Sequence, residues 1–176
     1  PAEKGALFCW KQKMGGQKFE IIGFDACLMG MIEVYGSLYP YSNYMVASEE
    51  VIPSTGWSYA AWLGQLAQNP AMTGRETTQA IISTYIVQDT AFTRASASDI
   101  AEVEAGTTLS AVESARVPDV IGAMNQLISV MASIDQTYVA QAREYTRSYY
   151  SILGEDTPSP FIDLGNFADI LANETG

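Results

Sequence analysis

The sequence predicts an α/β fold with a mostly parallel central sheet, and its hydrophobic pattern supports this at three neighbouring stretches. Residues 18–25 and 44–48 are short apolar runs, which predict strands. Between them, residues 29–39 carry apolar side chains at helical spacing, and Pro40 is expected to end that helix. Strand, helix and strand in this order form the βαβ unit of a parallel sheet.

The other elements are predicted from periodicity and from the signals at helix ends. Thr73, with Glu76 three residues later, forms a capping box that begins one helix. Ser114 is expected to cap another, whose apolar stripe as far as Met131 predicts core. Residues 89–105 have little periodicity, so a surface excursion is expected there. The remaining predictions are helices at 3–14, 59–68, 136–150 and 161–172, a third strand at 107–112, and loops at 51–58 and 154–160.

The composition indicates a chain with a hydrophobic core and an acidic surface. Its 176 residues are 48% hydrophobic, which is enough for one domain or most of one. Nine Lys and Arg against 20 Asp and Glu give a formal charge of −11, which argues against a nucleic-acid partner because phosphate binding needs clustered cations. An acidic field would attract cationic substrates, or it serves only solubility. No apolar run approaches the about 20 residues of a membrane span.

Asp25 and Cys27 are the candidate site residues, because they follow the first predicted strand. Ligands of open α/β sheets bind beyond the carboxyl ends of the strands, and residues two apart on an extended segment project to one side. The second predicted strand would deliver Ser48, Glu49 and Glu50 to the same edge. The alternatives are that the cysteine is a buried core residue and that the two glutamates are solvated loop charges.

The sequence contains no histidine. A cysteine nucleophile needs a partner that generates thiolate near neutral pH, and histidine is the usual one. Either the chain is catalytically silent or another polypeptide completes its site. A disulfide between Cys9 and Cys27 would also silence the nucleophile, but Cys9 lies in the helix predicted at 3–14 and is expected to pack there.

Several short motifs occur in a fixed order with short gaps. They are FDACLMG at 24–30, EV at 33–34, VASEE at 46–50 and PSTGWSY at 53–59, with weaker similarity at 109–112 and 161–167. Together they resemble the clostripain family of bacterial cysteine peptidases over nearly the whole chain. The resemblance implies a caspase-like αβα sandwich. Residues 1–176 would be the Cys-bearing portion of one peptidase domain, without its N-terminal strands.

The resemblance also implies roles for single residues. In that family the residue matching Cys27 is the nucleophile, and the acidic residue matching Asp25 lies in the pocket for a basic P1 side chain. The catalytic histidine lies upstream in a His-Gly motif, and maturation can cut the chain between the two. An endopeptidase that cleaves after Arg or Lys is therefore expected, with its histidine on a complementary N-terminal chain. Ser48 and Glu49 are further substrate-binding candidates.

The same resemblance predicts peptides and proteins with basic residues as substrates, and a secreted, periplasmic or cell-surface location in a bacterium. No cofactor is expected, except that some relatives depend on Ca²⁺; no acidic loop here has a recognisable Ca²⁺-ligand spacing. The alternative function is a catalytically silent member of the same fold that acts as a binding or interaction domain. That alternative explains the missing histidine without a second chain.

Overall fold

The computed structural model describes residues 15–53, 55–86, 96–149 and 159–175. The helix predicted at 3–14, with Cys9, lies outside the described residues, as does most of the loop predicted at 154–160. The chain divides into two compact units, residues 1–118 and 119–176, which are described here one after the other.

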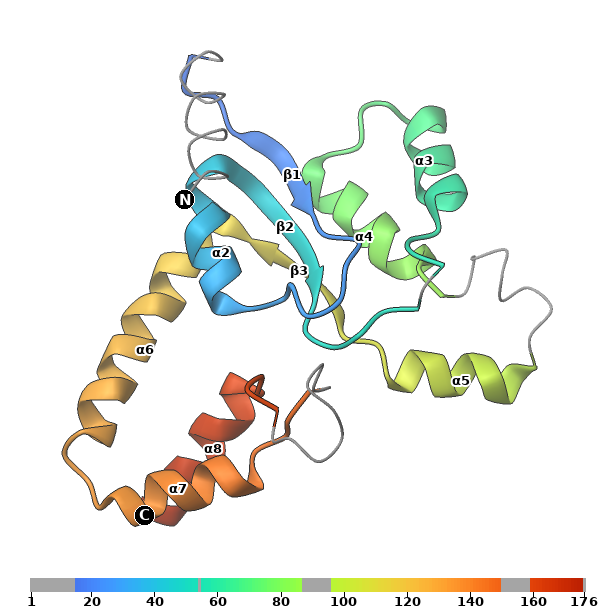
Figure 1. Cartoon of the computed structure of the whole chain (residues 1–176). Helices are drawn as coiled ribbons and strands as arrows, with labels where there is room; N and C mark the ends of the chain where they lie inside the picture. The colour runs from blue at the N-terminus through green and yellow to red at the C-terminus, as the bar shows by residue number, and fades with distance from the viewer. Residues whose placement is uncertain (1–14, 54, 87–95, 150–158, 176) are drawn as a thin grey trace. The chain divides into compact units, whose positions relative to one another are not determined.

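The first unit is built on a three-stranded sheet with the strand order β1-β2-β3. The strands β1 (Phe19–Gly23) and β2 (Ser42–Ser48) pair in parallel, and β3 (Leu109–Glu113) pairs antiparallel with β2. The helix α2 (Ile32–Leu38) and the 3-10 turn η1 (Tyr39–Tyr41) connect β1 to β2 (Figure 1). The predicted βαβ unit is confirmed, although the helix begins later than residue 29 and Pro40 lies inside the 3-10 turn that follows it.

The described sheet is mixed, whereas the sequence pattern predicts a mostly parallel one. Strand β3 begins beside the carboxyl end of β2 and runs back along it, so that Ser48 pairs with Leu109 and Tyr44 pairs with Glu113. Hydrophobic periodicity identifies a strand but carries no information on its direction. The direction of β3 follows from the edge at which the chain re-enters the sheet.

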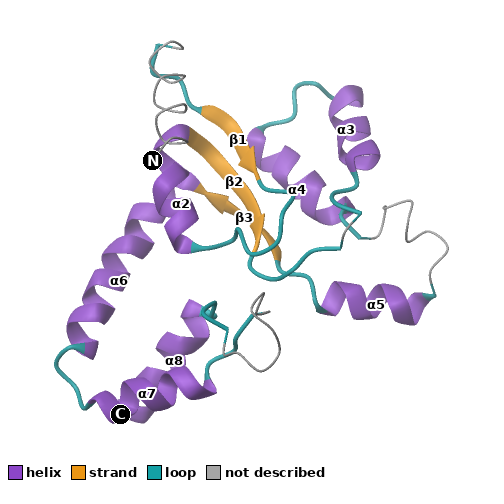
Figure 2. Cartoon of the chain, in the orientation of Figure 1, coloured by secondary structure: helices purple, strands orange, loops and turns teal. Residues whose placement is uncertain are grey.

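Helices lie on both faces of this sheet (Figure 2). The helix α4 (Gly74–Thr84) lies against all three strands, and α3 (Tyr59–Gln68) packs on α4. On β3, Leu109 packs into the core formed with α4, whereas the next residue, Ser110, lies beside Tyr35 of α2. Because successive strand residues point to opposite faces, α2 and α4 cover opposite faces of the sheet. The buried core residues on the α4 side are Val46, Trp57, Ile81, Tyr85 and Ile86.

The capping box predicted for α4 is confirmed. The Glu76 N–H donates to Thr73 Oγ1 at 3.2 Å, and the Glu76 carboxylate accepts from the Thr73 N–H at 2.7 Å. Hydrogen bonds from the Thr73 backbone and then from its hydroxyl lower the pKa of Glu76. These contacts satisfy N–H groups that a helix start leaves unpaired.

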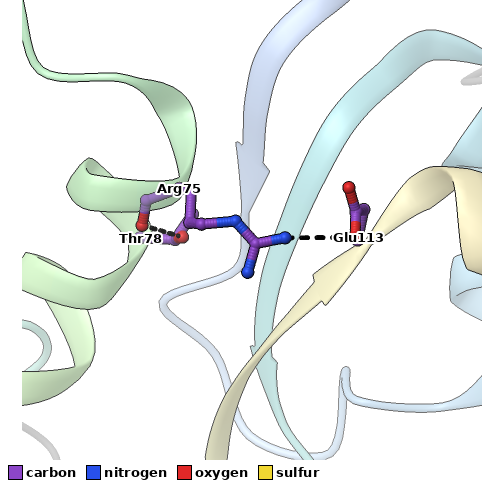
Figure 3. Close-up of polar contacts among 3 residues, drawn as sticks. All are labelled: Arg75, Thr78 and Glu113. Atoms are coloured by element: carbon purple, nitrogen blue, oxygen red, sulfur yellow. Dashed lines mark hydrogen bonds and ion pairs between the residues drawn. The ribbon is translucent and has the colours of Figure 1, made fainter.

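An ion pair joins the first turn of α4 to the end of β3. Arg75 Nη2 lies 3.2 Å from Glu113 Oε2, and the Arg75 carbonyl accepts from the Thr78 hydroxyl (Figure 3). The two charged side chains are 61% and 44% exposed, so water screens their attraction. An exposed pair of this kind contributes about 0–1 kcal/mol. The burial of α4 against the strands therefore stabilises the unit more than this ion pair does.

The prediction of a surface excursion at 89–105 is wrong for its second half, which forms the helix α5 (Ala97–Ala105). Ser96 and Asp99 close its start, since the Asp99 N–H donates to Ser96 Oγ and the Ser96 N–H donates to Asp99 Oδ2. Ile100 and Val103 then pack against the core of the first unit. Two apolar positions are too few to register as helical periodicity, so tertiary packing decides this element.

The second unit contains α6 (Val117–Met131), which begins at its boundary, α7 (Gln136–Tyr145) and α8 (Leu164–Thr175). The last two pack on each other around a buried cluster, and Asp135 Oδ1 caps α7 by accepting from the Thr137 N–H at 2.9 Å. The helix predicted at 136–150 thus ends early, and the one predicted at 161–172 begins late. The buried residues of the cluster are Ala142, Phe167 and Leu171.

The stripe of α6 that predicts core is only partly covered. Leu127 and Met131 pack against the cluster of the second unit, but Val120 and Ile128 are 43% and 56% exposed. The prediction of core is therefore wrong for Val120 and Ile128. An amphipathic pattern shows which side of a helix is apolar, but not how much of that side a neighbour covers.

Ser114 does not cap α6, in contrast to the prediction. It lies in the 3-10 turn η2 (Ser114–Arg116), and its hydroxyl lies 3.0 Å from the Ser42 hydroxyl at the start of β2. The two residues are 1% and 0% exposed. Because water cannot reach this pair, each hydroxyl depends on the other for its hydrogen bond.

The Ser42–Ser114 pair predicts a non-additive mutational response. Ser114→Ala leaves the Ser42 hydroxyl buried without this partner, so we expect a loss of about 1–3 kcal/mol in the free energy of unfolding. Adding Ser42→Ala should restore part of that loss, because the unpaired hydroxyl is removed. Urea unfolding of the two single variants and the double variant measures this coupling. Strict additivity would contradict the assignment.

Candidate functional site

Asp25 and Cys27 lie in the loop that follows β1, which ends at Gly23 rather than at residue 25. The alternation of an extended strand therefore does not extend to either residue. Both side chains are nevertheless exposed, and Cys27 is a free thiol. In the described residues the thiol therefore lies at the surface and not in the core.

The loop that carries Cys27 is bonded to the end of β2 through the backbone. Gly30 lies so close to β2 that an added Cβ would be 2.8 Å from the Glu49 backbone nitrogen, so a larger residue cannot follow this path. The neighbouring chain, and not local propensity, therefore sets the course of the loop. Three N–H groups of the loop donate, namely Phe24 to Val46 O at 2.9 Å, Leu28 to Glu50 O at 3.4 Å and Gly30 to Ser48 O at 2.7 Å.

Leu28, directly after Cys27, has a φ of 58°. Left-handed backbone costs an ordinary L-residue about 1–2 kcal/mol. The Leu28 side chain is only 6% exposed, so its burial helps to offset this cost. The sharp turn buries Leu28 while leaving the Cys27 thiol at the surface. Strained backbone of this kind is concentrated at functional sites, so the turn at Leu28 is a candidate functional site.

The Cys27 sulfur lies against the backbone of Ile52. The Ile52 N–H donates to Sγ at 3.3 Å, while the contact from Sγ to the Ile52 carbonyl is long at 4.0 Å. The Ile52 side chain packs against the core of the first unit, which holds this N–H in place. The sulfur thus accepts a hydrogen bond from a backbone group whose position the core fixes.

The Asp25 carboxylate is held by residues 56–59. Its Oδ2 accepts from the Trp57 N–H at 3.1 Å and from the Tyr59 hydroxyl at 3.0 Å. Gly56, with a φ of 71°, lets the backbone pass under the carboxylate, since an added Cβ would lie 2.5 Å from Oδ2. The Trp57 indole covers Gly23 at the end of β1. The carboxylate is thus fixed at the surface, beyond the end of the strand.

The Tyr59 ring, whose hydroxyl bonds to this carboxylate, belongs to a group of three aromatic residues. The Tyr59 ring centre lies 6.3 Å from that of Trp57 and 6.0 Å from that of Trp62. Burial, and then the hydrogen bond and charge of Asp25, raise the pKa of Tyr59, so its hydroxyl remains a donor to the carboxylate. An exposed carboxylate that is held in this way suits a cationic group.

Ser48 and Glu49 are placed differently from Asp25 and Cys27. The Ser48 side chain is fully buried, and its hydroxyl lies 3.1 Å from Thr108 Oγ1, so the structure does not bring it to the surface beside the thiol. Glu49 is partly exposed, and its charge raises the pKa of the buried Tyr35, although burial is the larger cause. Ser48 is linked to the site through its backbone, because its carbonyl accepts from the Gly30 N–H.

Thr108 was not a candidate from the sequence, yet it organises the end of β2. Its Oγ1 accepts from the Glu49 N–H at 3.0 Å and from the Glu50 N–H at 2.9 Å, and it bonds to the Ser48 hydroxyl. A hydroxyl has two lone pairs and one hydrogen, so its capacity is filled and Thr108 must donate to Ser48. A threonine before a strand carries no sequence signal of this role.

Within the described ranges, no group of three or more Cys, His, Asp or Glu side chains comes together as metal ligands. A search of the described helices finds none with the length and apolar character to cross a membrane.

The fold and the site together define an α/β protein with an exposed thiol and a fixed carboxylate beyond the first strand of the sheet. The model of the clostripain family matches residues 7–175. The chain therefore belongs to the clostripain family, and the resemblance in the motifs around Cys27 is confirmed. A search of curated proteins found no match.

Several solved structures are similar in fold. A cysteine protease from B. fragilis has a TM-score of 0.54 at 14% identity, with 98% of this chain and 64% of that one covered. A clostripain from Bacteroides thetaiotaomicron has a TM-score of 0.52 at 16% identity, covering 93% of this chain and 65% of its own. A secreted cysteine protease from the same organism has a TM-score of 0.51 at 17% identity, covering 97% and 43%. The chain thus spans less than two thirds of these proteins.

The contacts of Thr108 predict how far the end of β2 depends on one hydroxyl. Thr108→Val keeps the shape but leaves the Glu49 and Glu50 N–H groups without their acceptor, so the free energy of unfolding should fall by about 1–3 kcal/mol. Thr108→Ser keeps the oxygen and serves as the matched control. Denaturant unfolding of the two variants measures the difference, and equal stabilities would contradict the role of the hydroxyl.

Proposed function

We propose that this chain is the Cys-bearing portion of a cysteine endopeptidase that cleaves after Arg or Lys. The observation that carries the proposal is the exposed Cys27 thiol, with an N–H directed at its sulfur, in the same loop as the fixed Asp25 carboxylate. Membership of the clostripain family supports peptidase chemistry at that thiol. The complete domain would be a caspase-like αβα sandwich, and the 176 residues here would form part of it.

In this mechanism the Cys27 thiolate attacks the carbonyl carbon of the scissile bond. The tetrahedral oxyanion would be held by the Cys27 N–H and by a glycine N–H beside the missing histidine, and one such donor typically contributes about 10²–10³ in rate. Collapse of the tetrahedral intermediate breaks the peptide C–N bond and forms a thioester, while the leaving amine takes a proton from the imidazolium of the histidine. Water, deprotonated by the imidazole, then hydrolyses the thioester and regenerates the thiol.

The histidine has to come from outside this chain, which has none. Because the chain spans 64% and 65% of two solved relatives, there is room for it in the rest of a family domain. We place it on a complementary N-terminal chain produced by processing. A secreted location in a bacterium fits a relative described as a secreted protease. A dependence on Ca²⁺ is suggested only by analogy with the family, and we propose no ligands for the ion.

Asp25 would recognise the basic P1 side chain. Its carboxylate is exposed and is fixed by the Trp57 N–H and the Tyr59 hydroxyl, which suits an ammonium or guanidinium group. One relative, the clostripain from Bacteroides thetaiotaomicron, was solved with the peptide inhibitor BTN-VLTK-AOMK, whose peptide part ends in lysine. Glu49 remains a further candidate in the substrate cleft, and Ser48 would contribute through its backbone.

The competing function is a catalytically silent binding domain of the same fold, and the absence of histidine favours it. The two functions place different requirements on the sequence encoded upstream of Pro1. The peptidase requires a His-Gly at the end of a strand there, whereas the binding domain does not.

One prediction of the proposed function concerns the nucleophile. An Arg- or Lys-directed acyloxymethyl ketone should label Cys27 stoichiometrically when the chain is combined with its His-bearing portion, and intact mass with peptide mapping should locate the adduct. The chain alone should be inactive towards peptides, and Cys27→Ala should abolish turnover without changing the unfolding transition. Retained turnover in Cys27→Ala would end the nucleophile assignment. Absence of an adduct in the complete enzyme would favour the binding domain.

Another prediction of the proposed function concerns Asp25. Asp25→Asn removes the charge but keeps an acceptor oxygen, so the hydrogen bonds from the Trp57 N–H and the Tyr59 hydroxyl should persist. We expect kcat/KM for basic P1 residues to fall about 10- to 100-fold, since a charged hydrogen bond is worth about 1.5–3 kcal/mol, while slow cleavage of neutral substrates changes little. The exposed Glu104→Gln is the matched control. An equal loss for every P1 residue would instead show that Asp25 acts structurally.

A further inference from the structure

The two oxygens of the Asp25 carboxylate are not equivalent in the structure. The two described hydrogen-bond donors to this side chain, the Trp57 N–H at 3.1 Å and the Tyr59 hydroxyl at 3.0 Å, both donate to Oδ2. A carboxylate oxygen has about two lone-pair sites, so these donors fill Oδ2. No described residue donates a hydrogen bond to Oδ1, and the side chain is exposed. Only one oxygen is therefore open to a substrate.

The two donors are themselves held in place. The Trp57 side chain is 7% exposed and its indole covers Gly23, so its backbone N–H cannot easily move away. Tyr59 begins α3, and its ring is within contact distance of both the Trp57 ring and the Trp62 ring. Rotation of the carboxylate by half a turn exchanges the two oxygens but leaves one of them saturated as before. The difference between the two carboxylate oxygens is thus set by the two donors and not by the rotamer of Asp25.

A single open oxygen suits lysine better than arginine. The ammonium group of lysine is a compact charge that one acceptor oxygen can bind well. The guanidinium group is a planar fork that gains most when two parallel N–H groups meet both oxygens of a carboxylate. At Asp25 the second of those hydrogen bonds has no free acceptor. Arginine then keeps the charge attraction but loses the geometric advantage over lysine.

We propose that the Tyr59 hydroxyl, by occupying Asp25 Oδ2, sets the P1 preference of the enzyme in favour of lysine over arginine. This inference rests on the proposed function and narrows its substrate class. Tyr59 is a specificity-determining residue in it: it acts on the substrate through the carboxylate that it holds. The Trp57 N–H is the second donor, but a side-chain substitution cannot remove it.

The test uses the enzyme assembled with its His-bearing portion and two peptides that differ only in Lys or Arg at P1. Wild type should have the higher kcat/KM for the Lys peptide. Tyr59→Phe keeps the ring but opens one lone pair on Oδ2, so the ratio of kcat/KM for Arg to that for Lys should rise about three- to tenfold, the value of one hydrogen bond. Tyr145→Phe, at a 71% exposed tyrosine of the second unit, should leave the ratio unchanged.

The outcomes separate this inference from the function on which it rests. A wild-type preference for Arg, or a ratio unchanged in Tyr59→Phe, overturns the inference while cleavage of both peptides upholds the peptidase. An equal fall for both peptides in Tyr59→Phe, with an unaltered unfolding transition, also overturns it, because Tyr59 would then only support the fold of the loop. If wild type cleaves neither peptide, the proposed function itself fails.

Discussion

The candidate site depends on one backbone junction, where the loop after β1 is bonded to the end of β2. The Gly30 N–H donates to Ser48 O at 2.7 Å, and Thr108 Oγ1 in turn fixes the N–H groups of Glu49 and Glu50. Without this junction, nothing would enforce the left-handed turn at Leu28 that leaves Cys27 at the surface. Thr108, directly before the antiparallel strand β3, therefore contributes to the position of a thiol that is remote in the sequence.

One segment of the chain holds both the carboxylate and the thiol. Residues 51–59 supply the Ile52 N–H to the sulfur and the Trp57 N–H to Asp25, and both of these residues pack into the core of the first unit. Packing energy from the core is in this way used to orient polar groups at the surface. Rigid support of this kind suits catalysis, because reacting groups must be held near the productive geometry.

Local signals were reliable where a few neighbouring residues decide the outcome. The βαβ unit and the Thr73–Glu76 capping box are confirmed, because each follows from short-range geometry. The helix α5 and the direction of β3 escaped prediction, since both depend on what the chain meets elsewhere in the first unit. Ser114 has the side chain of a helix cap, yet burial next to Ser42 gives its hydroxyl another partner.

The sequence by itself determined the family, the two residues of greatest chemical interest, Asp25 and Cys27, and the absence of histidine from these 176 residues, because motif order and composition are properties of the chain alone. Tertiary structure decided what surrounds those residues. The Tyr59 hydroxyl reaches Asp25 across 34 positions, and Thr108 reaches the Glu49 N–H across 59. Hydrogen bonds of such sequence separation leave no periodic trace, because they form only after the core has brought distant segments together.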